Sequence, residues 1–187
     1  MKTIRQSIFE TNSSSTHSIA ISKKDVAVKD LPTKITFYIG EFGWSHEEVN
    51  RANYLYTALA SSYNKEDLDD AIKHIKGVLL DIGIESEFET PKWNDEYDWL
   101  QEGYIDHNET GEFINAVMNN DQMLLRYLFS DSHVYTGNDN DEFDNDNETK
   151  YVAKSKLFDY NSKLDKYEYM DNPYHDETKY DYFYKGN

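Results

Sequence analysis

The sequence predicts an α+β fold, or a layered α/β fold, and three observations support this. Alternating segments near the N-terminus are typical of short strands, two central segments have apolar residues at helical spacing, and a tyrosine-rich C-terminal segment alternates like a β-strand. The 187 residues suffice for one main domain. We expect a main domain over residues 1–137, an acidic loop or linker over 138–150, and a C-terminal segment over 151–187 packed on the main domain.

Three short strands are expected before the first helix, over residues 2–9, 16–22 and 34–39. In the second of these, His17 and Ile21 lie on the same face as the isoleucine between them, because side chains alternate along a strand. The polar run between the first two strands is expected to form a compact turn.

Two amphipathic helices follow, and their ends are marked by capping residues. Ser45 and Glu48 have the spacing of a capping box, so the first helix is expected to begin at Ser45. Asn64 is expected to cap the second helix and Gly83 to end it. The apolar stripes are Val49, Ala52, Tyr56, Leu59 and Tyr63 in the first helix, and Leu68, Ile72, Ile75, Leu79 and Ile82 in the second.

Shorter elements complete the chain. A strand is expected over residues 84–89 with three glutamates on one face, and another over 103–107. Two short helices are expected around 111–118 and 121–130, before the acidic, low-complexity run 138–148.

The net charge of −17 is the strongest compositional feature. Free nucleic-acid binders are normally basic, so we expect weak binding to naked nucleic acid and a partner with a basic surface. Residues 1–34 carry six basic and three acidic side chains, a net of +3, whereas residues 85–112 carry ten acids against one lysine, a net of −9. Glu85, Glu87 and Glu89 are therefore the candidate partner-binding residues.

The absence of cysteine excludes disulfide scaffolds and thiolate chemistry. No segment is apolar enough to suggest a membrane span or a signal peptide. We expect a soluble, cytoplasmic protein. No Walker A, dinucleotide-binding or nucleophile-elbow motif is present.

The segment from Arg5 to Ser18 holds the densest cluster of chemically useful side chains. His17 has the right chemistry for a general acid or base, Arg5 for a phosphate clamp and Glu10 for a base or an orienting group. The alternative is a turn stabilised by its own side chains. The candidate phosphate- or RNA-binding residues are Asn12, Ser13, Ser14, Ser15 and Thr16.

Asp106 and His107 are second candidates for the same site, although an Asp-His pair is also typical of a capped turn. No metal-binding motif is present, and no cofactor is required by the sequence. A divalent metal such as magnesium, held by Glu10, Asp106 or Glu41, stays open as an alternative.

The N-terminal stretch RQSIFETNSSSTHS, residues 5–18, resembles the opening of a family of small phage and mobile-element proteins of Gram-positive bacteria. Similar short motifs recur in the same order: GEFGW at 40–44, YLYTA at 54–58, YIDH at 104–107 and GNDN at 137–140. Within this group the chain resembles anti-CRISPR proteins, including a streptococcal-phage type, that act on type II RNA-guided DNA nucleases.

This resemblance implies a ribonuclease that inactivates the effector nuclease by truncating its guide RNA, with the cluster around His17 as the catalytic site. The partners would be the effector and its guide RNA, in the cytoplasm of an infected or lysogenic host. Two alternatives stay open: an acidic nucleic-acid mimic that blocks the effector stoichiometrically, and an unrelated phosphodiesterase or transferase.

Overall fold

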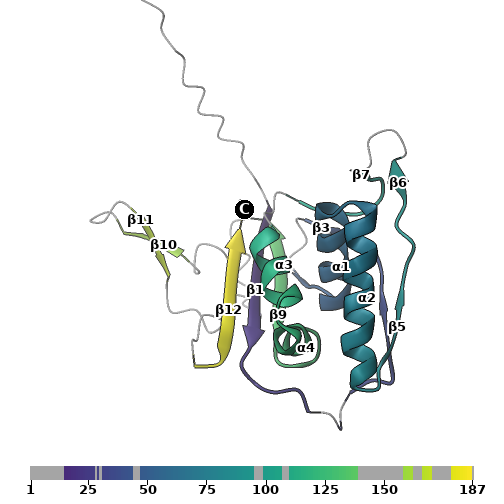
Figure 1. Ribbon diagram of the computed structural model, residues 1–187. Coiled ribbons are helices and arrows are strands. Elements are labelled where there is room, and N and C mark those ends of the chain that lie inside the picture. The colour runs from purple at the N-terminus through teal and green to yellow at the C-terminus, as the bar shows by residue number, and fades with distance from the viewer. Residues whose placement is uncertain are drawn as a thin grey trace, which may run out of the picture.

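The computed structural model describes residues 15–27, 29, 31–43, 47–94, 99–106, 110–138, 158–161, 166–169 and 178–186. Within these residues it contains four helices and several small sheets, which confirms the predicted α+β class (Figure 1). The strand expected over residues 2–9 and most of the acidic run lie outside the described residues.

The largest sheet has four strands in the order β12-β1-β9-β4. Strand β1 is central, and it pairs antiparallel with both β9 and β12. The C-terminal strand thus completes the sheet formed by the N-terminal one. The bounds are Ser15–Ser22 for β1, Glu47–Glu48 for β4, His133–Asn138 for β9 and Tyr180–Gly186 for β12.

The described residues also form four two-stranded pairs, two of them parallel and two antiparallel. The parallel pairs are β2 (Lys34–Phe37) with β5 (Glu85–Phe88), and β3 (Glu41–Phe42) with β8 (Tyr104–Ile105). The antiparallel pairs are β6 (Trp93–Asn94) with β7 (Trp99–Leu100), and β10 (Phe158–Asn161) with β11 (Lys166–Tyr169).

The first helix, α1 (Arg51–Ser62), begins later than its sequence pattern predicts. Its N-cap is Asn50, whose side chain accepts a hydrogen bond from the Asn53 amide at 3.1 Å. The predicted capping box beginning at Ser45 is wrong, because Glu48 belongs to β4, which pairs with β9. The pairing with β9 holds this segment extended and delays the helix.

The second helix, α2 (Lys65–Asp81), matches its predicted caps. The Asn64 side chain accepts from the Asp67 amide at 2.9 Å, and Gly83 has a φ of +81° just after the helix ends. A positive φ costs glycine little, so this residue terminates the helix without strain. The two short helices are also confirmed, as α3 (Gly111–Met118) and α4 (Asp121–Phe129).

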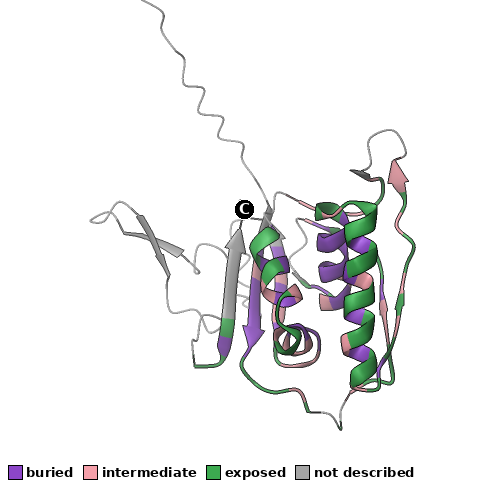
Figure 2. Ribbon diagram, viewed as in Figure 1, coloured by how far each residue is buried: buried purple, intermediate pink, exposed green. Residues whose placement is uncertain are grey.

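Helix α1 forms the centre of the molecule, between the four-stranded sheet on one side and α2 with β5 on the other (Figure 1). It is therefore buried around most of its circumference, whereas α2 buries one stripe (Figure 2). Three tyrosines in this core, Tyr54, Tyr56 and Tyr127, have fully buried side chains. Each hydroxyl has a hydrogen-bond partner, which offsets the cost of burying a polar group.

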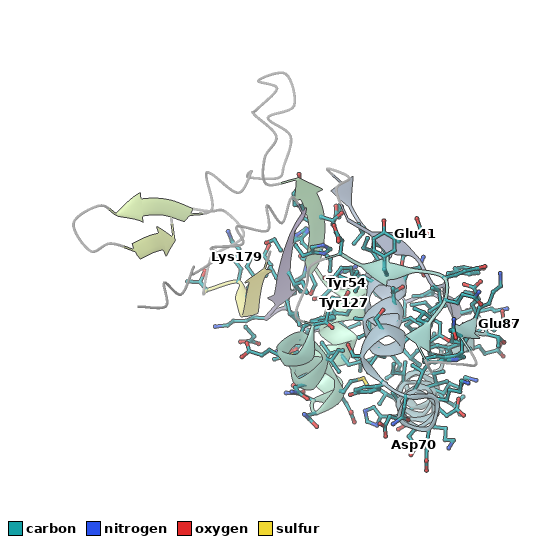
Figure 3. All side chains as sticks on the ribbon, turned by 90° about the horizontal axis from the view of Figure 1, so that it is seen from above. Glu41, Tyr54, Asp70, Glu87, Tyr127 and Lys179 are labelled. Atoms are coloured by element: carbon teal, nitrogen blue, oxygen red, sulfur yellow. The ribbon has the colours of Figure 1, made fainter. Side chains whose placement is uncertain are left out.

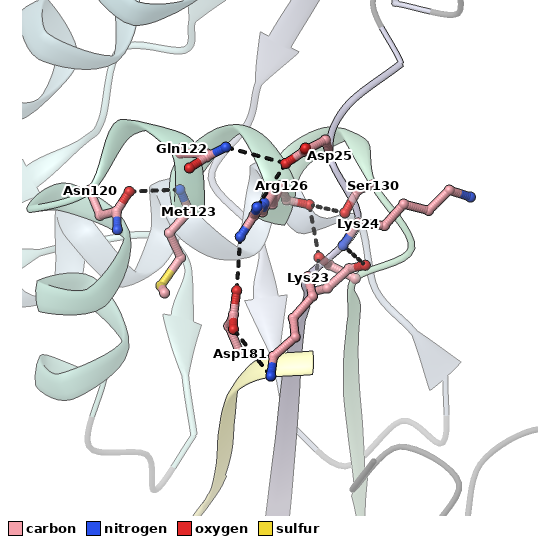
Figure 4. A network of polar contacts seen from close by, with 11 residues as sticks. Lys23, Lys24, Asp25, Asn120, Gln122, Met123, Arg126, Ser130 and Asp181 are labelled. Atoms are coloured by element: carbon pink, nitrogen blue, oxygen red, sulfur yellow. Dashed lines mark hydrogen bonds and ion pairs between the residues drawn. The ribbon is translucent and has the colours of Figure 1, made fainter. Parts of the chain in front are cut away.

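One arginine on α4 joins three distant parts of the chain (Figure 4). The guanidinium of Arg126 donates to Asp25 at 2.7 Å and to Asp181 at 2.8 Å, and Asp181 also lies 3.6 Å from the ammonium of Lys23. The Arg126 side chain is 19% exposed and Asp181 is 32% exposed, so this pair is better shielded from solvent than an ordinary surface ion pair, whereas Asp25 is largely exposed. The network fixes the start of β12 against α4 and β1.

Candidate functional site

His17 lies inside the four-stranded sheet rather than on its surface. It occupies the third position of β1, between Thr136 on β9 and Gly186 on β12. Its side chain has no exposed surface, and Thr136 beside it is also buried. The sequence predicts that His17 shares a face with Ile19 and Ile21, and all three are buried.

Tyr54 is the hydrogen-bond partner of this imidazole. Its hydroxyl lies 3.2 Å from His17 Nδ1, and the two rings are tilted with centroids 5.8 Å apart. A phenol hydroxyl that donates to Nδ1 would leave the ring proton of a neutral imidazole on Nε2. Helix α1 therefore fixes the orientation of the imidazole ring.

Burial lowers the pKa of His17 to about 4, because a charged imidazolium would lose its hydration. The negative charge and the backbone carbonyl of Asp106 act in the opposite direction but do not compensate for the desolvation. His17 is therefore neutral at physiological pH.

Asp106 approaches His17 from a different sheet. It follows β8 directly and is partly buried, and its amide donates to the Phe42 carbonyl at 2.8 Å. Because β3 and β8 are parallel, their carboxyl ends meet at one edge, where the Asp106 Cβ lies 3.5 Å from the position that a Cβ on Gly43 would take. The predicted candidates His17 and Asp106 are thus brought together electrostatically, although they are distant in sequence.

Gly103 sets the path of the chain into β8. Its φ is +85°, and a side chain there would clash with Ile39 and would place its Cβ 2.9 Å from the Gly40 carbonyl oxygen. Only glycine combines this backbone angle with this close approach. The position of Asp106 therefore depends on Gly103.

The second nitrogen of His17, Nε2, is buried and makes no hydrogen bond of good geometry with the described residues, although the Asp106 carbonyl acts on the ring. Such a group destabilises the fold by about 1–3 kcal/mol, so natural proteins usually avoid it. A neutral imidazole can take up or release a proton, but in this conformation the ring is enclosed. Its use as a catalyst would require this end of the sheet to open.

Two other predicted members of the N-terminal site lie within the described residues. Ser15 and Thr16 belong to β1, where their backbones pair with Asn138 and Gly137. The remaining candidates, Arg5, Glu10, Asn12, Ser13, Ser14 and His107, lie outside the described residues.

The predicted partner-binding glutamates lie on the outward side of the β2–β5 pair. Glu85 and Glu87 are exposed, whereas Phe88 is partly buried and stacks on the buried Phe37, with ring centroids 4.3 Å apart. This alternation confirms the prediction that the glutamates of this strand share its outer face. Figure 3 shows Glu87 projecting on a different side of the molecule from Asp70 of α2.

Glu89 has a structural role that its two neighbours lack. Its carboxylate accepts from the Ile39 amide at 2.8 Å, and its carbonyl accepts from the Tyr56 hydroxyl at 2.6 Å. The three glutamates are therefore not equivalent: Glu89 holds the end of β2 against α1, and Glu85 and Glu87 project outward.

Tyr38 extends this surface beyond the end of β2. Its side chain is 53% exposed, which is high for a large aromatic residue. Lys34 forms a 2.7 Å ion pair with Glu87, whose hydrogen bond raises the pKa of the lysine, and Glu85 and Tyr38 act in the same direction. We call the residues Lys34, Tyr38, Glu85, Glu87 and Glu89 the acidic face.

Sequence reasoning missed Tyr54 and Tyr38. Tyr54 falls outside the apolar stripe predicted for its helix, because a stripe assumes one buried face and α1 is enclosed on several. Tyr38 lies in a segment predicted as a strand with a buried face of isoleucine and phenylalanine. An aromatic residue on the opposite face is the one signal that the sequence offers for it.

Among the described residues, no three histidine, aspartate or glutamate side chains come close enough together to hold a metal ion. Glu10, one of the proposed magnesium ligands, is not among these residues.

No protein-family model matches the chain, and no curated protein or solved structure is significantly similar to it. No helix in the described part of the chain is long and apolar enough to cross a membrane.

Proposed function

We propose that this protein is an acidic binding module that inhibits a type II RNA-guided DNA nuclease in the cytoplasm of a phage-infected host. The observation that carries the proposal is the acidic face, where Glu85 and Glu87 project outward from β5 and an exposed tyrosine, Tyr38, follows the end of the neighbouring strand β2. The choice of effector rests on the resemblance of residues 5–18 to anti-CRISPR proteins.

The chemistry of the acidic face suits a basic protein surface. RNA-guided nucleases hold nucleic acid in positively charged channels, which an acidic protein can occupy in its place. Carboxylates such as Glu85 and Glu87 pair with arginine, and an exposed phenol such as Tyr38 can stack on a guanidinium. Tyrosine is also among the residues that dominate binding energy at interfaces.

A ribonuclease that truncates the guide RNA is the second candidate. It is favoured by the convergence of His17 and Asp106, and by the buried Nε2 of the histidine, which makes no hydrogen bond of good geometry with the described residues. We place it second because an enclosed imidazole with a pKa of about 4 is a weak base that does not reach solvent in this conformation.

The test incubates the purified protein with a guide-loaded type II effector, with magnesium or with EDTA. DNA cleavage and the length of the guide on a denaturing gel are then measured. Inhibited DNA cleavage with an intact guide supports the binding module, and a shortened guide supports the ribonuclease. Normal DNA cleavage with an intact guide excludes both for that effector.

Charge reversal then maps the surface. Glu85→Lys with Glu87→Lys should weaken the complex at least tenfold in a direct binding measurement. The matched comparison is Glu87→Lys alone against Asp70→Lys on α2, because each single reversal changes the net charge by the same amount. Asp70 is an exposed acid that projects on a different side of the molecule, so its reversal should leave binding nearly unchanged. Equal losses for the two variants would indicate a nonspecific charge effect and would exclude the acidic face as the contact site.

A further inference from the structure

Strand β12 lies at one end of the four-stranded sheet. It pairs with β1 on one side, and no described strand pairs with its other side. An edge of a seven-residue strand that no described strand covers presents backbone groups that can pair with another strand.

The sequence of β12 is self-complementary about its centre. It reads Tyr-Asp-Tyr-Phe-Tyr-Lys-Gly from Tyr180 to Gly186, with Phe183 in the middle. Two copies aligned antiparallel about Phe183 would place Asp181 opposite Lys185 of the partner subunit. Opposite charges and aromatic residues at facing positions stabilise antiparallel pairs.

We propose that the outer edge of β12 pairs antiparallel with the β12 of a second copy of this chain, forming a symmetric dimer with a continuous sheet. An arrangement of this kind is closed, because each copy uses the same surface. The proposal does not depend on the proposed inhibitory function.

Asp181 is held in a suitable position for this pairing. One of its carboxylate oxygens accepts from Arg126 at 2.8 Å, and the other lies 3.6 Å from Lys23, beyond hydrogen-bond distance. In the proposed register, Lys185 of the partner subunit occupies the position opposite this carboxylate. The network around Arg126 fixes this end of the strand before any partner arrives.

The charge of the molecule predicts how salt affects the dimer. Two copies of net charge −17 repel each other, but β12 itself carries one aspartate and one lysine and is neutral. Added salt screens the repulsion over about 8 Å at physiological ionic strength and has less effect on the backbone pairing. Dimerisation should therefore strengthen as salt rises.

The absence of cysteine from the chain allows a direct test by cross-linking. In Phe183→Cys, the two introduced thiols would face each other with Cα atoms about 5 Å apart, within disulfide range. In the control Lys185→Cys, the two thiols would be offset by four residues, about 13 Å along the strands. Mild oxidation should cross-link the first variant and not the second.

Sedimentation equilibrium of the unmodified protein provides a test that needs no variant. We expect a mass that rises with concentration and salt from 22.0 kDa toward twice that value. A single-chain mass at all concentrations and salt levels would overturn the proposal. So would equal cross-linking of the two cysteine variants, because random collision would then explain both.

Discussion

The buried pair of His17 and Tyr54 and the acidic face place ionisable groups in opposite environments. His17 is enclosed and has lost its charge, whereas Glu85 and Glu87 are exposed and remain solvated. Burial couples the protonation of His17 to folding, so this pair should respond to pH and to mutation through stability. The acidic face should respond through binding, with little change in stability.

The largest loss of stability is expected from a substitution at Gly103, where the backbone conformation sets the position of Asp106 beside His17. Gly103→Ala forces a side chain into a positive φ and against Ile39, and should lower the free energy of unfolding by about 3 kcal/mol. The measurement is urea denaturation. Gly77→Ala is the control, because a methyl group there meets nothing within 4 Å and should stabilise α2 by about 0.5–1 kcal/mol. Equal effects of the two substitutions would contradict the role assigned to Gly103.

The pH dependence of stability should come next in size. The pKa of His17 is about 4 in the folded state and near 6.5 when unfolded, so the unfolded chain binds more protons between these values. The stability contributed by neutral His17 is complete above pH 6.5 and falls by roughly 3 kcal/mol as pH drops to 4.

Comparison with His17→Asn isolates this contribution from that of the carboxylates. Asparagine keeps an acceptor near Nδ1 but does not titrate, so the variant should lose less stability than the native protein over this pH range. If the unfolding free energies of the two proteins fell by the same amount from pH 7 to pH 4, His17 would not be buried and neutral in the folded state.

Removing the hydroxyl of Tyr54 should have an intermediate effect. Tyr54→Phe keeps the aromatic ring but removes the hydroxyl that hydrogen-bonds to Nδ1 of His17. The free energy of unfolding, measured by thermal or urea denaturation, should fall by about 1–2 kcal/mol. When Tyr54→Phe is introduced into the His17→Asn variant, the change in unfolding free energy should differ from the change that it causes in the native protein, because the effects of substitutions at contacting residues do not add. Strict additivity would show that the two residues do not interact.

The smallest effect on stability is expected at the acidic face. Glu87→Gln removes an exposed ion pair with Lys34, and should change the unfolding free energy by less than about 0.5 kcal/mol. Glu89→Gln should cost more, because the Glu89 carboxylate receives the Ile39 amide. If Glu87→Gln were the more damaging substitution, the distinction drawn between these glutamates would be wrong.

Local patterns predict the elements of this fold better than their assembly. Asn64 and Gly83 mark the ends of α2, and the glutamates of β5 share one face, because caps and alternation depend on residues close in sequence. The capping box at Ser45 fails because β4 pairs with β9, more than eighty residues away. Pairing at that separation leaves no local signal.

The candidate site shows the same limit. The residue type of His17 suggested chemistry, but its enclosure depends on β9, β12 and α1, none of which is near it in sequence. The approach of Asp106 depends on the parallel pairing of β3 with β8. Both contacts arise from tertiary packing. The apolar periodicity that predicts strands and helices from sequence carries no information about which elements pack together.

The position of β1 in the sheet has a consequence for synthesis on the ribosome. Both strands that pair with β1 are made long after it, β9 at residues 133–138 and β12 at 180–186. While translation proceeds, β1 has neither of these neighbours, and the polar His17 has no sheet to enclose it. The sheet around β1 is complete only once β12 has been made, so products stalled or released before that point should be targets for chaperones and proteases.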